Sequence, residues 1–156
     1  MIETVLVRHV LPAVFAAAIM LSSAHAADPI QLITRQEAAL PAAGIAATGT
    51  RNLTRGPGID TLPTPDKGVD GKPFRLAVRF VPSNGVPVDP STVRVFYRRQ
   101  PPLDITERVK TFITPAGIDA PAVVVPPGTH VIEIEATDKE GRIGRRQLQL
   151  TVAPSP

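Results

Sequence analysis

The chain of 156 residues contains no cysteine and no tryptophan, and only one tyrosine. Without cysteine the protein has no disulfide framework, no thiolate metal site and no cysteine nucleophile. With no tryptophan and 4% aromatic residues, a sugar-stacking site is disfavoured. The excess of positive charge is also small, because 17 Lys+Arg residues against 14 Asp+Glu residues give a net charge of +3. These charges are interleaved along the chain, which argues against a nucleic-acid partner.

Long apolar runs are missing as well. The run Val10–Leu21 has 12 residues, whereas a helix needs roughly 20 to cross a bilayer core of about 30 Å. Small residues at Ala24 and Ala26 follow it and fit a signal-peptidase site. We therefore predict a signal peptide over residues 1–26, a mature chain beginning at Ala27 without a stable membrane span, and a periplasmic or secreted protein. The alternative is an uncleaved anchor.

Proline and glycine are abundant, with 18 and 11 residues, and leave little room for long helices. Instead of long helices, the sequence predicts a β-hairpin over Gly128 to Val152. Its first strand places every second residue on an apolar face, and its second strand resumes the alternation after a turn at Asp138–Gly141. The residues expected to face inward are His130, Ile132, Ile134, Ala136, Leu148, Leu150 and Val152.

The residues upstream of the hairpin predict further strands. Phe74–Phe80 and Thr92–Tyr97 alternate cleanly, Ala122–Val125 is a short apolar strand, and prolines around Ile59 predict an irregular edge strand. Asp104–Glu107 could cap a helical turn that runs through Val109, or the segment could be a poor strand at Val109–Ile113, and periodicity does not decide between them. About seven strands over residues 56–153 predict an all-β fold, an antiparallel immunoglobulin-like β-sandwich forming one domain.

A leader, residues 27–55, precedes this domain. Thr34–Glu37 matches a capping box, which predicts one or two helical turns ending before Pro41. Two interpretations stay open for the leader. It is either a loosely tethered arm, or it docks on the sandwich through its apolar residues Ile30, Leu32, Ile33 and Leu40.

The segments PPGTHVIEIEATDKEGRIGRRQLQLTV and VDPSTVRVFY carry a family resemblance. The first resembles the last two strands of bacterial immunoglobulin-like domains, and the second resembles their mid-domain strand. The likeness covers roughly residues 56–153, and its motifs consist of turn and core positions. It therefore implies a fold and no chemistry. The Cys-Trp-Cys core of true immunoglobulin domains is replaced here by aliphatic and Phe residues.

Metal sites find little support in the sequence. After cleavage only His130 remains, and one histidine does not make the multi-ligand sites of zinc or copper. Small periplasmic copper carriers share the layout of a leader and a sandwich, but Ala27 and Lys139 stand where they use histidines. Calcium needs about six to eight oxygens, and Asp66, Asp70 and Asp138 fit turn formers better. We therefore expect no cofactor, with a copper or calcium carrier as the alternative function.

Catalysis is not supported either. Ser83 and Ser91 lie in predicted turns, and no G-x-S-x-G motif occurs. We expect a non-enzymatic binding or structural module of the bacterial cell envelope, with an unknown protein or envelope component as its partner.

Two features suggest where a partner binds. Arginines flank Glu133 and Glu135 on the outer face of the predicted sheet, which fits a neutralised ladder of cross-strand charges, with an anionic-surface site as the alternative. Two apolar residues of that face are expected to be covered by the leader or by a partner. The candidate partner-binding residues are Phe96, Val131, Arg98, Arg99, Arg142 and Arg146.

Overall fold

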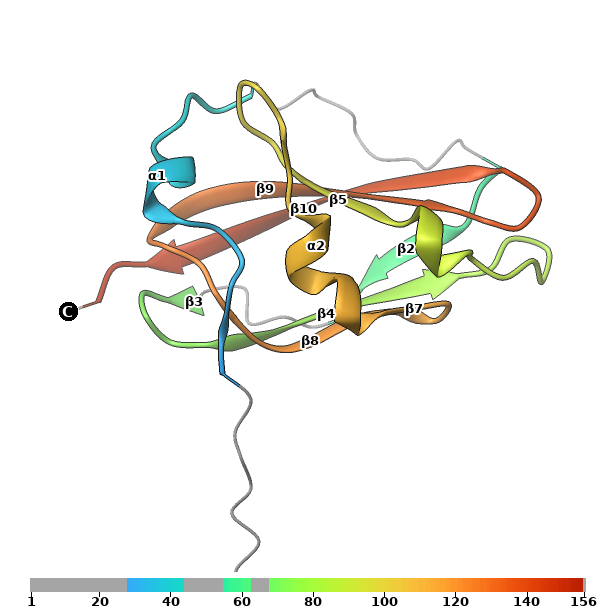
Figure 1. Cartoon of the computed structure of the whole chain (residues 1–156), viewed down its shortest axis with the longest axis horizontal. Helices are drawn as coiled ribbons and strands as arrows, with labels where there is room; N and C mark the ends of the chain where they lie inside the picture. The colour runs from blue at the N-terminus through green and yellow to red at the C-terminus, as the bar shows by residue number, and fades with distance from the viewer. Residues whose placement is uncertain (1–27, 44–54, 63–67, 156) are drawn as a thin grey trace, which may run out of the picture.

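A computed structural model of the chain describes residues 28–43, 55–62 and 68–155. The predicted signal peptide lies outside these residues, as does Asp66. Two β-sheets pack face to face around one hydrophobic core, an all-β arrangement compatible with a β-sandwich (Figure 1).

The first sheet has the strand order β1-β8-β4-β2, with β7 also pairing with β8. Its central strand β4 packs Leu76, Val78 and Phe80 into the core, as the alternation predicts. On its outer face Arg75 lies 2.7 Å from Asp119, and Arg79 lies 3.4 Å from Asp60. The strands span β1 (Ile30–Gln31), β2 (Gly58–Thr61), β4 (Phe74–Val81), β7 (Ile113–Thr114) and β8 (Gly117–Val124).

The second sheet has the order β3-β10-β9-β5-β6. The predicted hairpin is confirmed, since β9 and β10 pair antiparallel from Thr137 opposite Ile143 to Gly128 opposite Val152. Its inward residues Ile132, Ile134 and Ala136 are fully buried. The strands span β3 (Gly68–Val69), β5 (Arg94–Tyr97), β6 (Leu103–Asp104), β9 (Gly128–Thr137) and β10 (Ile143–Ala153).

The number and extent of the strands correct the sequence prediction. The described part of residues 56–153 holds nine strands instead of about seven, because three strands of two residues each lie at sheet edges, and a further two-residue strand, β1, forms in the leader. Runs this short have no periodicity, and only the neighbouring strand makes them extended. The apolar strand expected at Ala122–Val125 also begins earlier, at Gly117, because Ile118 and Ala120 face the core.

The ambiguous segment after β6 is helical. Helix α2 (Thr106–Val109) continues into the 3₁₀ turn η2 (Lys110–Phe112), so the alternative of a strand is wrong for Val109–Phe112, and the strand β7 begins only at Ile113. The carboxylate of Asp104 accepts the Thr106 N–H at 2.9 Å. The hydroxyl of Thr106 then accepts the Val95 N–H at 2.9 Å, which replaces a strand partner at the edge of β5.

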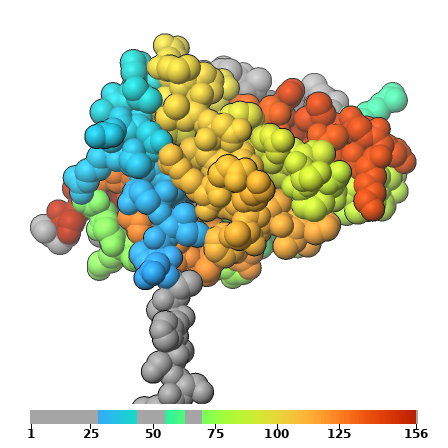
Figure 2. Space-filling model, in the orientation of Figure 1, coloured from blue at the N-terminus to red at the C-terminus, as the bar shows by residue number. Residues whose placement is uncertain are grey.

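The leader docks on the sandwich in residues 28–43, which overturns the interpretation as a loose arm there. Leu32 and Ile33 are fully buried, and β1 pairs in parallel with β8. Helix α1 (Arg35–Ala38) begins with the predicted capping box, in which Thr34 and Glu37 each accept the other's backbone N–H. Glu37 also holds Arg108 of α2 through two hydrogen bonds of 2.8 and 2.5 Å. Figure 2 shows the leader lying against the surface of the segment that contains α2.

Candidate functional site

Phe96 and Val131 lie half-buried on the outer face of the second sheet, as predicted. Their neighbours Val95, Tyr97 and Ile132 are buried, with at most 1% exposure, which confirms the phase of both strands. Phe96 pairs directly with Glu133, and the Arg98 N–H donates to the Val131 carbonyl at 2.9 Å. Phe96 and Val131 are therefore diagonal neighbours on adjacent strands, with Arg98 beside them. We call these three residues the outer patch.

The charge ladder around the outer patch forms in part. Arg145 lies 2.6 Å from Glu135, and Arg98 lies 3.8 Å from Glu133. Glu133 also accepts a hydrogen bond from the Gln147 amide at 2.8 Å. Arg94 stands opposite Glu135 in register, but its guanidinium turns away and donates to the carbonyls of Ser91 and Val93. Arg94 therefore does not join the ladder and instead contacts the segment that precedes β5.

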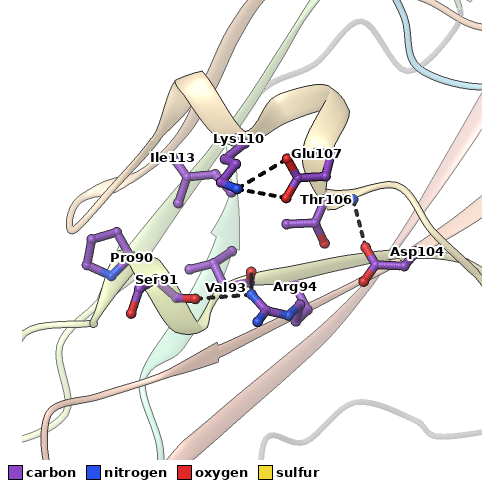
Figure 3. Close-up of a pocket in the computed structure, with 9 residues that line it drawn as sticks. All are labelled: Pro90, Ser91, Val93, Arg94, Asp104, Thr106, Glu107, Lys110 and Ile113. Carbon is purple, nitrogen blue, oxygen red and sulfur yellow. Dashed lines mark hydrogen bonds and ion pairs between the residues drawn. The ribbon is translucent and has the colours of Figure 1, made fainter.

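A cleft of about 560 Å³ adjoins the outer patch at the edge of β5. It lies between α2 and the 3₁₀ turn η1 (Pro90–Thr92), and Figure 3 shows side chains from both elements around it. Arg94 shares its strand face with Phe96, and Asp104 of β6 pairs with Phe96 of β5, so two residues that line the cleft are direct neighbours of Phe96. The charged and polar side chains around the cleft include Arg94, Asp104, Thr106, Glu107 and Lys110.

The cleft presents charges of both signs. Lys110 lies 2.8 Å from Glu107 (Figure 3). Burial alone would raise the pKa of Asp104, but its hydrogen bonds from Thr106 outweigh burial and lower the pKa below its usual value. The carboxylate is therefore ionised at neutral pH. Such a cleft suits a partner that carries a polar or charged group beside an apolar one.

The remaining candidate arginines do not join the outer patch as one surface. Arg142 lies at the β9–β10 turn, where its Nε donates to Asp138 at 2.7 Å and its Nη2 to the Ser83 carbonyl at 3.1 Å. That turn begins seven positions after Val131, at Asp138, which is roughly 23 Å along an extended strand. Arg146 is half-buried on β10, paired in register with Ile134. Only Arg99 lies close to Arg98 along the chain, and its guanidinium turns towards Tyr97.

His130 faces the core, as predicted, and is hydrogen-bonded there. It is 1% exposed, its Nδ1 lies 2.7 Å from the Tyr97 hydroxyl, and its Nε2 lies 2.9 Å from the Pro126 carbonyl. Burial is the main cause that lowers its pKa. The sequence placed Tyr97 and His130 on one inward face, but it did not show that Arg99 would complete the cluster. The only sign of this cluster in the sequence was that the single tyrosine, Tyr97, and His130 both fall on inward-facing strand positions.

Two of the aspartates considered for calcium, Asp70 and Asp138, lie in the described residues and are engaged within the protein. Asp138 is 3% exposed and accepts the backbone N–H groups of Glu140 and Arg142, which confirms it as a turn former. Asp70 lies 3.1 Å from Arg35 of α1. Across residues 28–43, 55–62 and 68–155, no three His, Asp or Glu side chains form a group suited to a metal ion.

Comparisons of the chain with protein-family models, with curated proteins and with solved structures gave no match. Within the part of the chain that the structure describes, neither helix has the length and apolar character that a bilayer crossing requires.

Proposed function

We propose that this chain is an immunoglobulin-like domain that works outside the cytoplasm, in the bacterial cell envelope, as a non-enzymatic module that binds a protein partner. The observation that carries the proposal is the half-buried Phe96, which lies on the outer sheet face between the mixed-charge cleft and Arg98. The predicted signal peptide supports the compartment, and the strand order supports the fold.

The order of the strands matches the immunoglobulin scheme at several points. In that scheme, strands A, B and E share one sheet, and strands C, F and G share the other. Here β2, β4 and β8 are neighbours in the first sheet, and β5, β9 and β10 are neighbours in the second. The segment preceding β4 contributes to both sheets, since β2 pairs with β4 while β3 pairs in parallel with β10. This supports the resemblance seen in the sequence.

The composition of the site favours a protein partner over an anionic surface. An interface centre is apolar, often aromatic, and surrounded by a polar rim, as Phe96 and Val131 are by Arg98 and the cleft. An anionic surface would instead need unpaired cations. Arg145 is paired with Glu135, Arg142 with Asp138, and Arg98 lies near Glu133. A partner that places an apolar side chain on Phe96 and a polar one in the cleft fits these features best.

The carrier alternative has less support. Both ring nitrogens of His130 are engaged in hydrogen bonds inside the core, and Asp138 is held by its own turn. Binding a metal through either residue would first break these contacts.

The proposal is tested by site-specific photo-crosslinking in cells that export the protein. A benzophenone amino acid replaces Phe96, or Val131, or Val81 as the matched control. Val81 is 40% exposed and belongs to the other sheet. We expect one crosslinked adduct from positions 96 and 131 and none from position 81. Adducts of equal yield at all three positions, or none at position 96, would remove the outer patch as the binding surface.

A second measurement tests the predicted compartment independently of the binding site. Fractionation of the same cells locates the protein, and we expect it in the periplasmic or culture fraction. A cytoplasmic protein that still crosslinks at position 96 would overturn the compartment and keep the site. With the partner identified from the adduct, Phe96→Ser should weaken binding at least about tenfold, about 1.4 kcal/mol, and Val81→Ser should leave it unchanged.

A further inference from the structure

The buried histidine belongs to a chain of hydrogen bonds that reaches the leader. Arg99 Nε donates to the Tyr97 hydroxyl at 2.6 Å, and that hydroxyl lies 2.7 Å from His130 Nδ1. His130 Nε2 lies 2.9 Å from the Pro126 carbonyl. The other end of Arg99 leaves the core, because its Nη1 donates to the Leu40 carbonyl at 3.1 Å. One side chain thus connects the core histidine to the leader.

The geometry fixes the protonation of this chain. A carbonyl oxygen only accepts, so His130 Nε2 must carry a hydrogen, and in the neutral ring Nδ1 is then an acceptor. The Tyr97 hydroxyl donates to Nδ1 and accepts from Arg99. Every group has a partner only while His130 is neutral.

The segment Leu40–Ala43 depends on this end of the molecule for its attachment. Besides the Arg99 contact, the Gln100 N–H donates to the Pro41 carbonyl at 3.0 Å, and the Ala43 N–H donates to the Arg98 carbonyl at 3.4 Å. The first part of the leader is held elsewhere, by Arg108. Its Nη1 donates to the Leu32 carbonyl at 2.7 Å, and the guanidinium also binds Glu37.

Protonation of His130 would directly disturb the attachment of the segment Leu40–Ala43. A protonated Nδ1 would donate to the Tyr97 oxygen, which already accepts from Arg99, and would displace the Tyr97 proton from its acceptor. It would also place a second positive charge beside the Arg99 guanidinium, whose Cζ lies 4.9 Å from the centre of the Tyr97 ring. In a site where His130 is 1% exposed, solvent screens that repulsion little.

We propose that His130 is a buried acid sensor, and that its protonation releases the leader segment Leu40–Ala43 from the sandwich while α1 stays bound. The proposal does not depend on the partner-binding function. The charged and titratable groups that face the sensor are Tyr97 and Arg99 from β5 and the residues after it, with Glu37 of α1 acting on Tyr97 through space. Glu37 is in turn neutralised by Arg108 of α2.

The pKa directions of His130 and Glu37 agree with a leader in which acid affects Leu40–Ala43 and leaves α1 bound. The pKa of His130 is lowered by burial, so the folded state holds the ring neutral. The pKa of Glu37 is lowered to about 2, chiefly by the hydrogen bonds from Arg108. Acid that charges the histidine therefore leaves the Arg108–Glu37 pair intact until the pH approaches about 2.

Hydrogen exchange of the full chain, read by mass spectrometry on short peptides and corrected for the intrinsic effect of pH, tests the proposal. Below a pH of about 6.5, the ordinary histidine pKa, the protection of the Ala43 and Gln100 amides should fall about tenfold per pH unit until the lowered pKa is reached. The Ala38 and Leu32 amides, which donate to Thr34 and Val124, should keep their protection. His130→Gln, which does not titrate, should abolish the dependence on pH.

Three results would overturn the proposal. The first is an unchanged protection of Ala43 and Gln100 between pH 7 and 5. The second is an equal loss at Ala38 and Leu32, which would show that acid opens the whole molecule. The third is a His130→Gln variant that keeps the acid response. If that variant does not fold, the ring resonances of His130 in the wild-type chain decide, because a measured pKa at or above about 6.5 contradicts the proposal.

Discussion

Asp138 and Arg142 close the β9–β10 turn through two contacts, since both the backbone N–H and the Nε of Arg142 donate to the Asp138 carboxylate, at 2.9 and 2.7 Å. Arg142 also reaches the Ser83 carbonyl in the loop after β4. The buried Asp138 carboxylate thus organises the hairpin turn, and the arginine that it holds attaches the turn to the loop that follows β4. This relationship leads to the first prediction.

Asp138→Asn should lower the urea midpoint of unfolding, because an amide presents N–H donors where Arg142 needs an acceptor. Burial raises the pKa of Asp138, but the hydrogen bonds from Arg142 and Glu140 outweigh it and the pKa is lowered. The stabilisation by the charge is therefore present above a pH of about 4 and is lost as the pH falls further. Glu140→Gln serves as the matched variant, because its exposed carboxylate lies 3.3 Å from the same Arg142 and should contribute less. Equal midpoints for both variants would contradict the role of Asp138.

The core of the second sheet can be tested at Ile134, which is fully buried on β9. Ile134→Ala should reduce the free energy of unfolding by about 2–5 kcal/mol. Gln149→Ala, at an exposed position on the neighbouring β10, should cost less than about 0.5 kcal/mol. Chemical denaturation compares the two, and similar costs would show that the strands have the opposite phase.

The docked leader makes a prediction that a loose arm does not. Leu32→Ala should cost about 2–5 kcal/mol of unfolding free energy, since Leu32 is fully buried in the core. Gln36→Ala, on the exposed side of α1, should change stability by less than about 0.5 kcal/mol. If Leu32→Ala left the unfolding transition unchanged, residues 28–43 would not be part of the cooperative fold.

The Arg108–Glu37 pair predicts a specific dependence on pH. The pKa of Glu37 is lowered to about 2, so its charge contributes stability above the ordinary glutamate pKa of about 4.3. That contribution is lost as the pH falls through about 2. Glu37→Gln should therefore cost about 1.5–3 kcal/mol at pH 7 and much less near pH 2. A cost that stays constant from pH 7 to pH 2 would show that the charge is not involved.

Export is predicted from residues outside the described structure. The small residues Ala24 and Ala26 predict a mature chain that begins at Ala27. Intact-mass spectrometry of the periplasmic and culture fractions checks this terminus. A chain that keeps Met1 and stays in the membrane fraction would favour the uncleaved anchor, and replacing Ala24 and Ala26 by bulky residues should convert one outcome into the other.

The sequence by itself determined the features that arise from neighbouring residues. The alternation of Phe74–Phe80 and of His130–Ala136 fixed which side chains face the core, because successive strand residues point to opposite faces. The capping box at Thr34 and the turn at Asp138 could be predicted for the same reason. In each case the side chain bonds to a backbone group at most four residues away.

The tertiary structure alone decided what depends on distant partners. The two-residue edge strands exist because a longer strand pairs with them, and the leader docks because Arg108 and β8 lie within its reach. The outer patch follows from the phase of two strands, but the cleft beside it required α2 to form next to β5. The Arg99–Tyr97–His130 cluster joins residues up to 33 positions apart, and its link to Leu40 spans 59. No local pattern encodes such contacts, because only packing of the two sheets and the leader brings these groups together.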